Sequence, residues 1–268
     1  MDDQQCGAMG VALPMTSPSA TGRYLIYLFC FGEKFRRLAT MAVKSAREIG
    51  GWSHDIVLLS DSAAPLAGCE DVMVIDMRAA VMERYPWATL RGNSLHHLKT
   101  EVDHHVDLAR YDYVLYLDCD VLVTTRRLSD LVPALCRDCA IVVQQDIIAV
   151  ASGAGFAGGK ILTKEEQRRW GEYAINAGVV GFPTTPMGRR LLRDWRQLGV
   201  DQHFNSRDQG NLVSLLLRKY HGQWGYITDA VIGRDLRPYE QTFVHFTNRK
   251  ETLMEAYYKD ILGLSLPE

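Results

Sequence analysis

The stretch from Tyr111 to Val123 reads YDYVLYLDCDVLV, and it combines the pattern of a buried strand with two carboxylates. Its aromatic, β-branched and leucine residues are typical of a β-strand. Asp118 and Asp120 interrupt the apolar run near its end. Side chains two residues apart on a strand share a face, with their Cα atoms roughly 6–7 Å apart. Because carboxylates this close repel each other, a divalent cation between them is the leading hypothesis.

Strand-like and helix-like patterns alternate on both sides of this stretch. Strand patterns occur at RYLIYLFC (23–30), HDIVLLSD (54–61), DVMVID (71–76), CAIVVQQD (139–146), AGVVGF (177–182) and FVHFT (243–247). Apolar residues at helical spacing predict helices over residues 33–48, 93–110, 184–199, 208–220 and 251–266. The alternation predicts one α/β domain over residues 23–268, with a mostly parallel central sheet and helices on both faces. Residues 1–22 read as a disordered lead-in.

The bulk properties are those of an ordinary soluble chain. Its 268 residues are 47% hydrophobic and 23% charged, and the formal net charge of −2 gives no reason to expect a nucleic-acid partner. The longest apolar run, YLIYLFCF (24–31), is far shorter than the roughly 20 residues of a membrane-spanning helix. The first cationic residue is Arg23, so no charged region precedes an apolar run. We therefore expect a cytoplasmic protein without a transmembrane segment.

A third candidate ligand for a cation stands far from the two aspartates in the sequence. His245 lies in FVHFTNRK (243–250), where a strand pattern passes into polar residues. Ligands of open α/β sheets bind beyond the carboxyl ends of the strands, which is where Asp118, Asp120 and His245 all fall. Two carboxylates with one imidazole suit Mn²⁺ and tolerate Mg²⁺. We therefore predict a metal site formed by these three residues.

Two other patterns imitate functional motifs. His97, Glu101 and His105 recur on one face of a predicted helix, but mixed faces of this kind are typically solvated rather than metal-binding. GAGFAGGK (153–160) imitates a phosphate-binding loop, yet it has Ala154 and Ile161 where that motif needs glycine and Ser or Thr. We expect a solvated helix face in the first case and a mobile loop over the site in the second.

From YVLYLDCDVLV outward, the chain resembles glycosyltransferases with the GT-A fold. In particular it resembles their family 8, the group that contains glycogenin and bacterial lipopolysaccharide galactosyltransferases. Further matches follow in the expected order at HHLKTEV (96–102), INAGVVGF (175–182), RDQGNL (207–212) and VHFTNRK (244–250), with a looser one at LFCFGEKF (28–35). The resemblance covers about residues 23–250 and implies a single Rossmann-like GT-A domain.

The resemblance also implies roles for individual residues. It gives Asp118, Asp120 and His245 as ligands of Mn²⁺ (or Mg²⁺), and Asp208 and Gln209 as the catalytic residues beside the donor sugar. It gives the donor-binding residues as Phe31, Gly32, Lys99, Asp118, Asn176 and Lys250. The family's last motif has glycine at the position of Asn248 and its lysine one place after Lys250, followed by Pro-Trp, which this chain lacks. The diphosphate contact therefore falls either to Lys250 or to Arg249.

The implied activity is retaining transfer of a hexose, glucose or galactose, from a UDP-sugar to an acceptor hydroxyl. The acceptor is left open, with a saccharide, a glycolipid and a small molecule as the candidate classes. Retention by double displacement needs a carboxylate nucleophile, and the amide of Gln209 is a poor one, so front-face attack is favoured. A sugar-1-phosphate nucleotidyltransferase is one alternative, although CFGEKFRR (30–37) has one glycine where that class has a glycine-rich loop. A non-catalytic relative that binds sugar nucleotides is the other.

Overall fold

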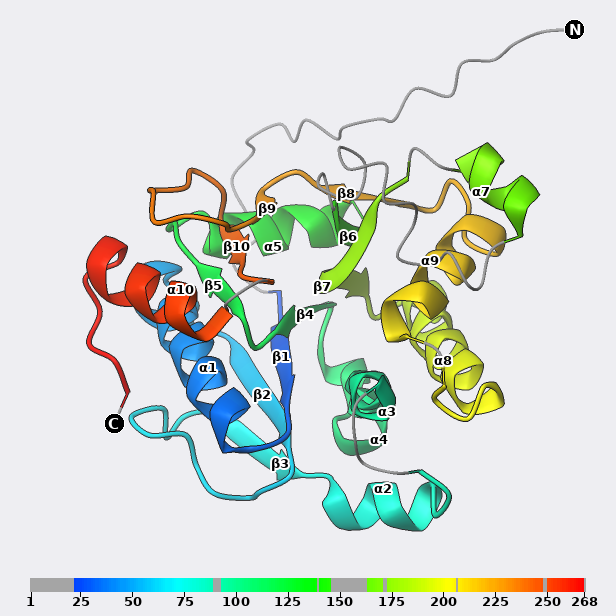
Figure 1. Cartoon of the computed structure of the whole chain (residues 1–268), viewed down its shortest axis with the longest axis horizontal. Helices are drawn as coiled ribbons and strands as arrows, with labels where there is room; N and C mark the ends of the chain where they lie inside the picture. The colour runs from blue at the N-terminus through cyan, green and yellow to red at the C-terminus, as the bar shows by residue number, and fades with distance from the viewer. Residues whose placement is uncertain are drawn as a thin grey trace, which may run out of the picture.

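The computed structural model describes residues 22–88, 93–138, 140–145, 163–170, 173–205, 207–247 and 250–267. The lead-in predicted for residues 1–22 thus lies outside the described residues, apart from Gly22. Within these ranges the chain forms a larger and a smaller sheet surrounded by helices (Figure 1). The larger sheet has the spatial order β3 (Met73–Asp76), β2 (Asp55–Ser60), β1 (Tyr24–Cys30), β4 (Tyr113–Asp118), β7 (Ile175–Pro183), β6 (Ile141–Gln145) and β8 (Trp224–Ile227). The smaller sheet has the order β5 (Val121–Val123), β10 (Phe243–His245) and β9 (Ala230–Ile232).

Helices alternate with these strands along the chain. The longer ones are α1 (Glu33–Lys44), α5 (Leu128–Arg137), α8 (Pro186–Asp201) and α9 (Asp208–Arg218). The shorter helical segments are η1 (Ser45–Ile49), α2 (Arg78–Arg84), α3 (Asn93–His97), η2 (Leu98–Glu101), α4 (Val102–His105), η3 (Leu108–Arg110), α7 (Lys164–Trp170), α10 (Lys250–Ala256) and η4 (Tyr257–Ile261). In the part of the chain that the structure describes, no helix combines the length and the hydropathy that crossing a membrane requires.

Most neighbouring strands of the larger sheet run parallel. β1 pairs in parallel with β2 and β4, β2 with β3, and β6 with β8. β7 is antiparallel to both β4 and β6. Parallel strands buried on both faces read as continuous apolar runs, and every residue of β1 is buried. The predicted α/β fold with a mostly parallel sheet is therefore confirmed.

Alternate residues of β1 enter two apolar cores, one on each face of the larger sheet. Ile26 and Leu28 pack in the core that includes residues of α1, α5 and α10. Leu25 and Tyr27 pack in the core that includes residues of α8 and α9. Figure 1 shows α1 and α10 to one side of this sheet and α8 and α9 to the other. The two-residue period of the strand thus explains why helices cover both faces.

The helix predicted over residues 93–110 is wrong as one continuous element. The segment forms α3, η2, α4 and η3 in succession, so 3-10 turns interrupt the α-helical ones. The Thr100 hydroxyl donates to the His97 carbonyl at 2.7 Å, a local bond that competes with the α-helical pattern. The η2 turn carries Lys99, Thr100 and Glu101, all of which are buried. This turn, rather than a regular helix, therefore presents Lys99 to the edge of the sheet.

Candidate functional site

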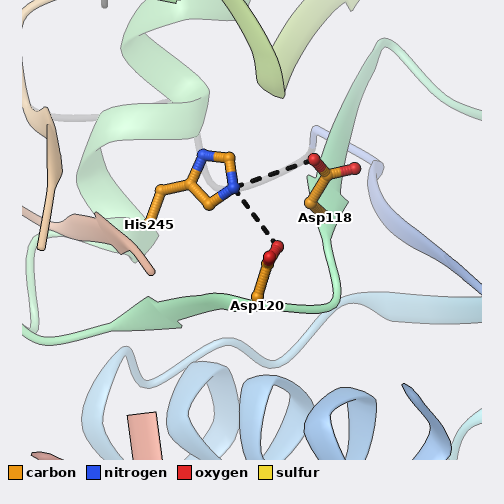
Figure 2. Close-up of side chains that lie close together, drawn as sticks. All are labelled: Asp118, Asp120 and His245. Carbon is orange, nitrogen blue, oxygen red and sulfur yellow. Dashed lines mark ion pairs between the residues drawn. The ribbon is translucent and has the colours of Figure 1, made fainter. Parts of the chain in front are cut away.

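Two carboxylates and one imidazole converge where the chain passes from the larger sheet to the smaller. β4 ends at Asp118, the chain turns through Cys119 and Asp120, and β5 begins at Val121. His245 is the last residue of β10, and the pairing of β10 with β5 places it opposite Val121. Figure 2 shows the His245 ring directed at both carboxylates. One ligand atom from each of Asp118, Asp120 and His245 lies within 4.8 Å of the other two.

The sequence predicts this convergence for a reason that is partly wrong. Asp118 and Asp120 do not share one strand face, because the strand ends at Asp118 and Asp120 lies in the turn that follows. The Phe246 backbone N–H anchors this turn by donating to the Asp120 carbonyl at 2.9 Å. The two carboxylates therefore meet through a change of sheet rather than through the two-residue period of a strand.

The distances and the burial of the three side chains fit a divalent cation. His245 Nε2 lies 3.2 Å from Asp120 Oδ1 and 3.8 Å from Asp118 Oδ2. The side chains of His245 and Asp120 are 5% exposed, whereas that of Asp118 is 29% exposed and opens the group to solvent. Carboxylate oxygens with one imidazole nitrogen are suitable ligands for Mn²⁺ or Mg²⁺. Among the residues described, no second group of His, Cys, Asp and Glu side chains converges in this way.

Lys99 forms a buried bridge between two carboxylates of the site. Its Nζ lies 3.0 Å from Asp118 Oδ1 and 2.9 Å from Asp208 Oδ2, and Lys99 is 2% exposed. Burial disfavours the ammonium form, but the two carboxylates outweigh it and raise the pKa of Lys99 above its usual value. Burial also acts to raise the pKa of Asp208, but Lys99 outweighs that effect, so this pKa is lowered. Lys99 and Asp208 therefore form an ionised pair at neutral pH.

This bridge gives the two oxygens of Asp118 different partners. Oδ1 accepts hydrogen bonds from Lys99 and from the Tyr116 hydroxyl. Burial, followed by the charge of Asp118, raises the pKa of Tyr116 well above its usual value, so the hydroxyl remains a donor. Oδ2 is the oxygen that faces His245. One oxygen of Asp118 is thus anchored in the protein while the other is directed at the candidate metal position.

The pairing of β6 with β7 is irregular beside this group. The register shifts between Val143, which faces Val180, and Gln144, which faces Asn176. The Asn176 side chain accepts the Gly178 backbone N–H through Oδ1 at 2.7 Å. Irregularities of this kind re-aim side chains and are frequent next to active sites. The predicted donor-binding residue Asn176 therefore lies at this irregular part of β7.

The two predicted catalytic residues open α9 at the same edge. Gln209 Oε1 accepts the Ala177 backbone N–H at 3.3 Å, which ties the start of α9 to β7. The Trp195 indole N–H donates to the Asp208 carbonyl at 2.8 Å, which ties it to α8. With the Lys99 bridge, these contacts bring Asp208 and Gln209 next to the end of β4.

Gly178 is expected to be required for the position of the His245 ring. A Cβ at Gly178 would overlap that ring and would come to 3.0 Å from Asn176 Oδ1. We expect Gly178→Ala to displace the imidazole and to lower Mn²⁺ affinity by about tenfold or more. Overpacking is expected to cost a further 1–3 kcal/mol of unfolding free energy, roughly. Calorimetric titration with Mn²⁺ measures the first effect, and denaturant unfolding measures the second.

Gly225→Ala in β8 is the matched control for this prediction. A Cβ at Gly225 meets no atom within 4 Å, so the same substitution there leaves its neighbours in place. We expect the control to bind Mn²⁺ like the wild type. Equal Mn²⁺ affinity in Gly178→Ala and Gly225→Ala would mean that the ring position does not govern metal binding.

The predicted uridine-binding start lies at the end of β1, beside β4. The φ of Gly32 is +92°, a value that favours glycine, and its N–H lies 3.1 Å from both carboxylate oxygens of Asp61. Phe31 is half-buried and stacks on Phe29 with ring centroids 5.0 Å apart. Phe31 and Gly32 thus lie at the sheet edge that carries Asp118.

The predicted stripe of His97, Glu101 and His105 forms neither a metal centre within the described structure nor a solvated face. Its central residue, Glu101, is 1% exposed. Glu101 accepts a hydrogen bond from the Tyr85 hydroxyl at 2.7 Å and forms an ion pair with Arg84. The expectation of a solvated face is wrong because Arg84, the last residue of α2, and Tyr85, which follows it, both contact Glu101. Glu101 therefore has a structural role.

Two predictions fall outside the described residues. The glycine-rich segment 153–160 was expected to be a mobile loop over the site. The Lys250 side chain and Arg249 were expected to supply the diphosphate contact. Both expectations stay predictions.

Three residues of the site were not predicted from the sequence, namely Tyr116, Asp61 and Gln144. Tyr116 stands two residues before Asp118 on the same strand, so strand periodicity was a usable signal for it. Asp61 and Gln144 are polar residues at the carboxyl ends of apolar strand patterns. Polar residues at that edge of an α/β sheet were the available signal for them.

Comparisons with known proteins place this chain among solved glycosyltransferase structures. No protein-family model matches the sequence, and no curated protein matches it. The galactosyltransferase LgtC, solved in complex with donor and acceptor sugar analogs, is 17% identical at a TM-score of 0.60. That match covers 91% of this chain and 98% of LgtC.

Two further solved structures share the arrangement. The bifunctional glycosyltransferase WbbM is 11% identical at a TM-score of 0.56, over 87% of this chain and 47% of WbbM. A glycosyltransferase involved in glycosylation of the major capsid of PBCV-1 is 13% identical at a TM-score of 0.51, over 88% of this chain and 98% of that one. At these identities the likeness establishes the fold alone. The fold is GT-A, as the sequence predicts.

Proposed function

We propose that this protein is a retaining, metal-dependent glycosyltransferase of family 8 that transfers a hexose from a UDP-sugar to an acceptor hydroxyl. The observation that carries the proposal is the convergence of Asp118, Asp120 and His245 at the carboxyl edge of a GT-A sheet. The fold's solved examples, including a galactosyltransferase with donor and acceptor analogs, support sugar transfer. Glucose or galactose is the proposed sugar, and a saccharide, a glycolipid or a small molecule is the proposed acceptor.

The charge of the site explains why the reaction would depend on a metal. A UDP-sugar carries negative charge on its diphosphate, and breaking the sugar–phosphate bond adds charge to the leaving oxygen. Asp118, Asp120 and Asp208 outnumber the cation of Lys99, so this group by itself repels a diphosphate. A Mn²⁺ or Mg²⁺ held by Asp118, Asp120 and His245 would supply Lewis-acid neutralisation at the phosphate oxygens.

The remaining residues are proposed to bind and orient the donor. Phe31 and Gly32 would contact the nucleotide, Asn176 the sugar, and Lys250 or Arg249 the diphosphate. The burial of Lys99 Nζ between Asp118 and Asp208 supports a role for Lys99 other than direct contact with the nucleotide. We propose that Lys99 holds these two carboxylates in place, so that Asp118 is positioned to bind the metal and Asp208 to orient the donor sugar.

Retention is proposed to proceed by front-face substitution. Asp208 is paired with Lys99 and 7% exposed, and the amide of Gln209 is a weak nucleophile. The acceptor hydroxyl would attack the anomeric carbon from the face that the phosphate leaves, and the leaving phosphate oxygen would take the hydroxyl proton. Gln209 and Asp208 would orient the sugar in this step. Stabilisation of the separating charges by groups already in place is the main source of rate.

Cytoplasm is the proposed compartment. Cys30 and Cys69 are buried thiols outside any disulfide. Burial raises the pKa of each thiol to about 11, which keeps both in the unreactive protonated form. Structural thiols of this kind suit a reducing environment.

The test of the proposal is the release of UDP from a panel of UDP-sugars, with Mn²⁺ and with EDTA. We expect slow hydrolysis of one donor in the absence of acceptor, abolished by EDTA. A nucleotidyltransferase would instead release pyrophosphate from UTP and a sugar 1-phosphate. A non-catalytic relative would bind UDP without turnover. Failure of every donor to release UDP, together with no binding of UDP in Mn²⁺, would contradict the proposal.

A further inference from the structure

The His245 ring is held on its far side by a glutamine that the proposed reaction does not use. Gln144 Oε1 lies 3.0 Å from His245 Nδ1, and both side chains are buried. The other ring nitrogen, Nε2, faces Asp118 and Asp120 (Figure 2). The two nitrogens of one imidazole therefore have separate partners, an amide on one side and the carboxylates on the other.

The partner at Nδ1 decides which ring nitrogen is able to bind a cation. A neutral imidazole carries one proton, and the nitrogen that binds a metal is the one with the lone pair. If Nδ1–H donates to Gln144 Oε1, the lone pair lies on Nε2 and points at the carboxylates. Partners of this kind fix the tautomer and the ring orientation of histidine ligands. We infer that Gln144 is a positioning residue that directs His245 Nε2 toward the cation, an inference that rests on the proposed metal centre.

The fold turns Gln144 toward this ring through the irregular pairing of β6 with β7. Val143 packs in the core that includes α8 and α9, so Gln144 points to the opposite face of the sheet. The register shift falls between these two residues. Gly178 lies in β7, two residues after Asn176, and its lack of a side chain leaves the space that the His245 ring occupies. The imidazole is thus confined between a glycine and a hydrogen-bonding amide.

A glutamine has two ways to meet Nδ1, and only one of them supports metal binding. Gln144 Nε2 is buried and has no hydrogen-bond partner among the described residues, so no second contact there fixes which end of the amide faces the ring. If the NH₂ end faced Nδ1, the ring proton would lie on Nε2 and would donate to Asp120. A glutamate has acceptors at both ends and presents one in either orientation. Gln144→Glu therefore tests whether the acceptor is what matters.

The experiment compares Mn²⁺ binding to metal-free wild-type protein and to three variants. Electron paramagnetic resonance of unbound Mn²⁺ measures the affinity. We expect Gln144→Met, which has no acceptor of comparable strength, to weaken binding by about 10–100-fold. Gln144→Glu is expected to bind Mn²⁺ at least as tightly as the wild type. Val143→Ala, which loosens the same strand on its other face, is expected to keep the wild-type affinity.

A second readout reports the ring itself rather than the stability of the fold. Electron spin echo spectra of bound Mn²⁺ should show coupling to an imidazole nitrogen in the wild type and in Gln144→Glu, and a weakened coupling in Gln144→Met. If Gln144→Met does not fold, Gln144→Asn replaces it, because a shorter amide cannot reach Nδ1. The same loss of affinity and coupling is expected for it.

The outcomes separate this inference from the proposed function. Wild-type affinity in Gln144→Met, or weak binding in Gln144→Glu, overturns the role of Gln144 and leaves the metal centre standing. Bound Mn²⁺ without nitrogen coupling in the wild type also overturns it, because His245 is then not a ligand. Wild-type protein that binds no Mn²⁺ overturns the proposed metal centre and this inference together.

Discussion

Replacement of Asp120 by asparagine is expected to abolish Mn²⁺ binding and to lower hexose transfer on the order of 1,000-fold. Asp120 is 4% exposed, and its Oδ1 lies 3.2 Å from His245 Nε2. Asparagine keeps the shape of the side chain but removes one anionic ligand. It also relieves repulsion between the carboxylates of Asp118 and Asp120. The metal-free variant is therefore expected to be at least as stable as the metal-free wild type.

Thermal unfolding with and without Mn²⁺ measures this effect directly. At a Mn²⁺ concentration 100 times its dissociation constant, the wild type should gain about 2.7 kcal/mol of stability. Asp120→Asn should gain none. Asp55→Asn is the matched control, because Asp55 begins β2 at the opposite edge of the sheet. The control loses the same charge and should keep the stabilisation by Mn²⁺; equal stabilisation of Asp120→Asn would refute its role as a ligand.

Lys99→Met is expected to have the largest effect on the fold, a loss of about 3–5 kcal/mol of unfolding free energy at neutral pH. The substitution keeps most of the unbranched side chain but leaves Asp118 and Asp208 without their shared cation. Asp208 is buried, so its charge is costly when unpaired. Urea unfolding at neutral pH measures the loss. A loss below about 1 kcal/mol would place the bridge among weak surface pairs.

The loss in Lys99→Met is expected to shrink as the pH falls. In the folded wild type the pKa of Asp208 lies below the usual 3.8, so the ion pair contributes stability above that pH and loses it as pH falls through the lower folded value. In Lys99→Met the charge that opposes burial most strongly is lost, and only His96 and His97 still lower the pKa of Asp208, so we expect burial to raise it. The unfolding free energy of Lys99→Met is therefore expected to lie below that of the wild type at neutral pH, and the difference is expected to shrink in acid. A gap between the two proteins that stays constant from neutral to acid pH would contradict this cause.

A double substitution separates the charge from the shape of the bridge. Lys99→Met combined with Asp208→Asn removes both partners of the ion pair between Lys99 and Asp208. We expect the double variant to be more stable than Lys99→Met, because the buried carboxylate that lacked a partner is gone. Destabilisation that is simply additive would mean that the two side chains do not interact.

The sequence was sufficient to predict the strands and helices whose apolar residues follow a regular pattern. Every residue of β1 is buried, and the apolar run RYLIYLFC (23–30) predicted this strand. The meeting of Asp118, Asp120 and His245 was also predicted, because all three lie at or just after the carboxyl ends of strand patterns in the sequence. Apolar strand patterns and polar residues at the ends of strands can both be recognised in the local sequence, and folding brings the polar strand ends together.

The rest of the site depends on contacts that no local pattern contains. The turn at Asp120 leads into a second sheet, which the strand pattern up to Val123 did not reveal. Lys99 was predicted from resemblance to contact a nucleotide, but its ion pairs with Asp118 and Asp208 join three distant segments. Gln144 lies 101 residues from His245 along the chain. Pairings of this kind are set by tertiary packing, which single-sequence patterns do not encode.

The central claim is that Asp118, Asp120 and His245 hold a divalent cation that binds a nucleotide diphosphate. The most direct test is a calorimetric titration of UDP into the metal-free protein, into the protein with Mn²⁺, and into Asp120→Asn with Mn²⁺. We predict that UDP binds the wild type with Mn²⁺ at least about 100-fold more tightly than it binds either the metal-free protein or the variant, a difference of about 2.8 kcal/mol or more. Equal affinity for UDP in all three titrations would contradict the claim.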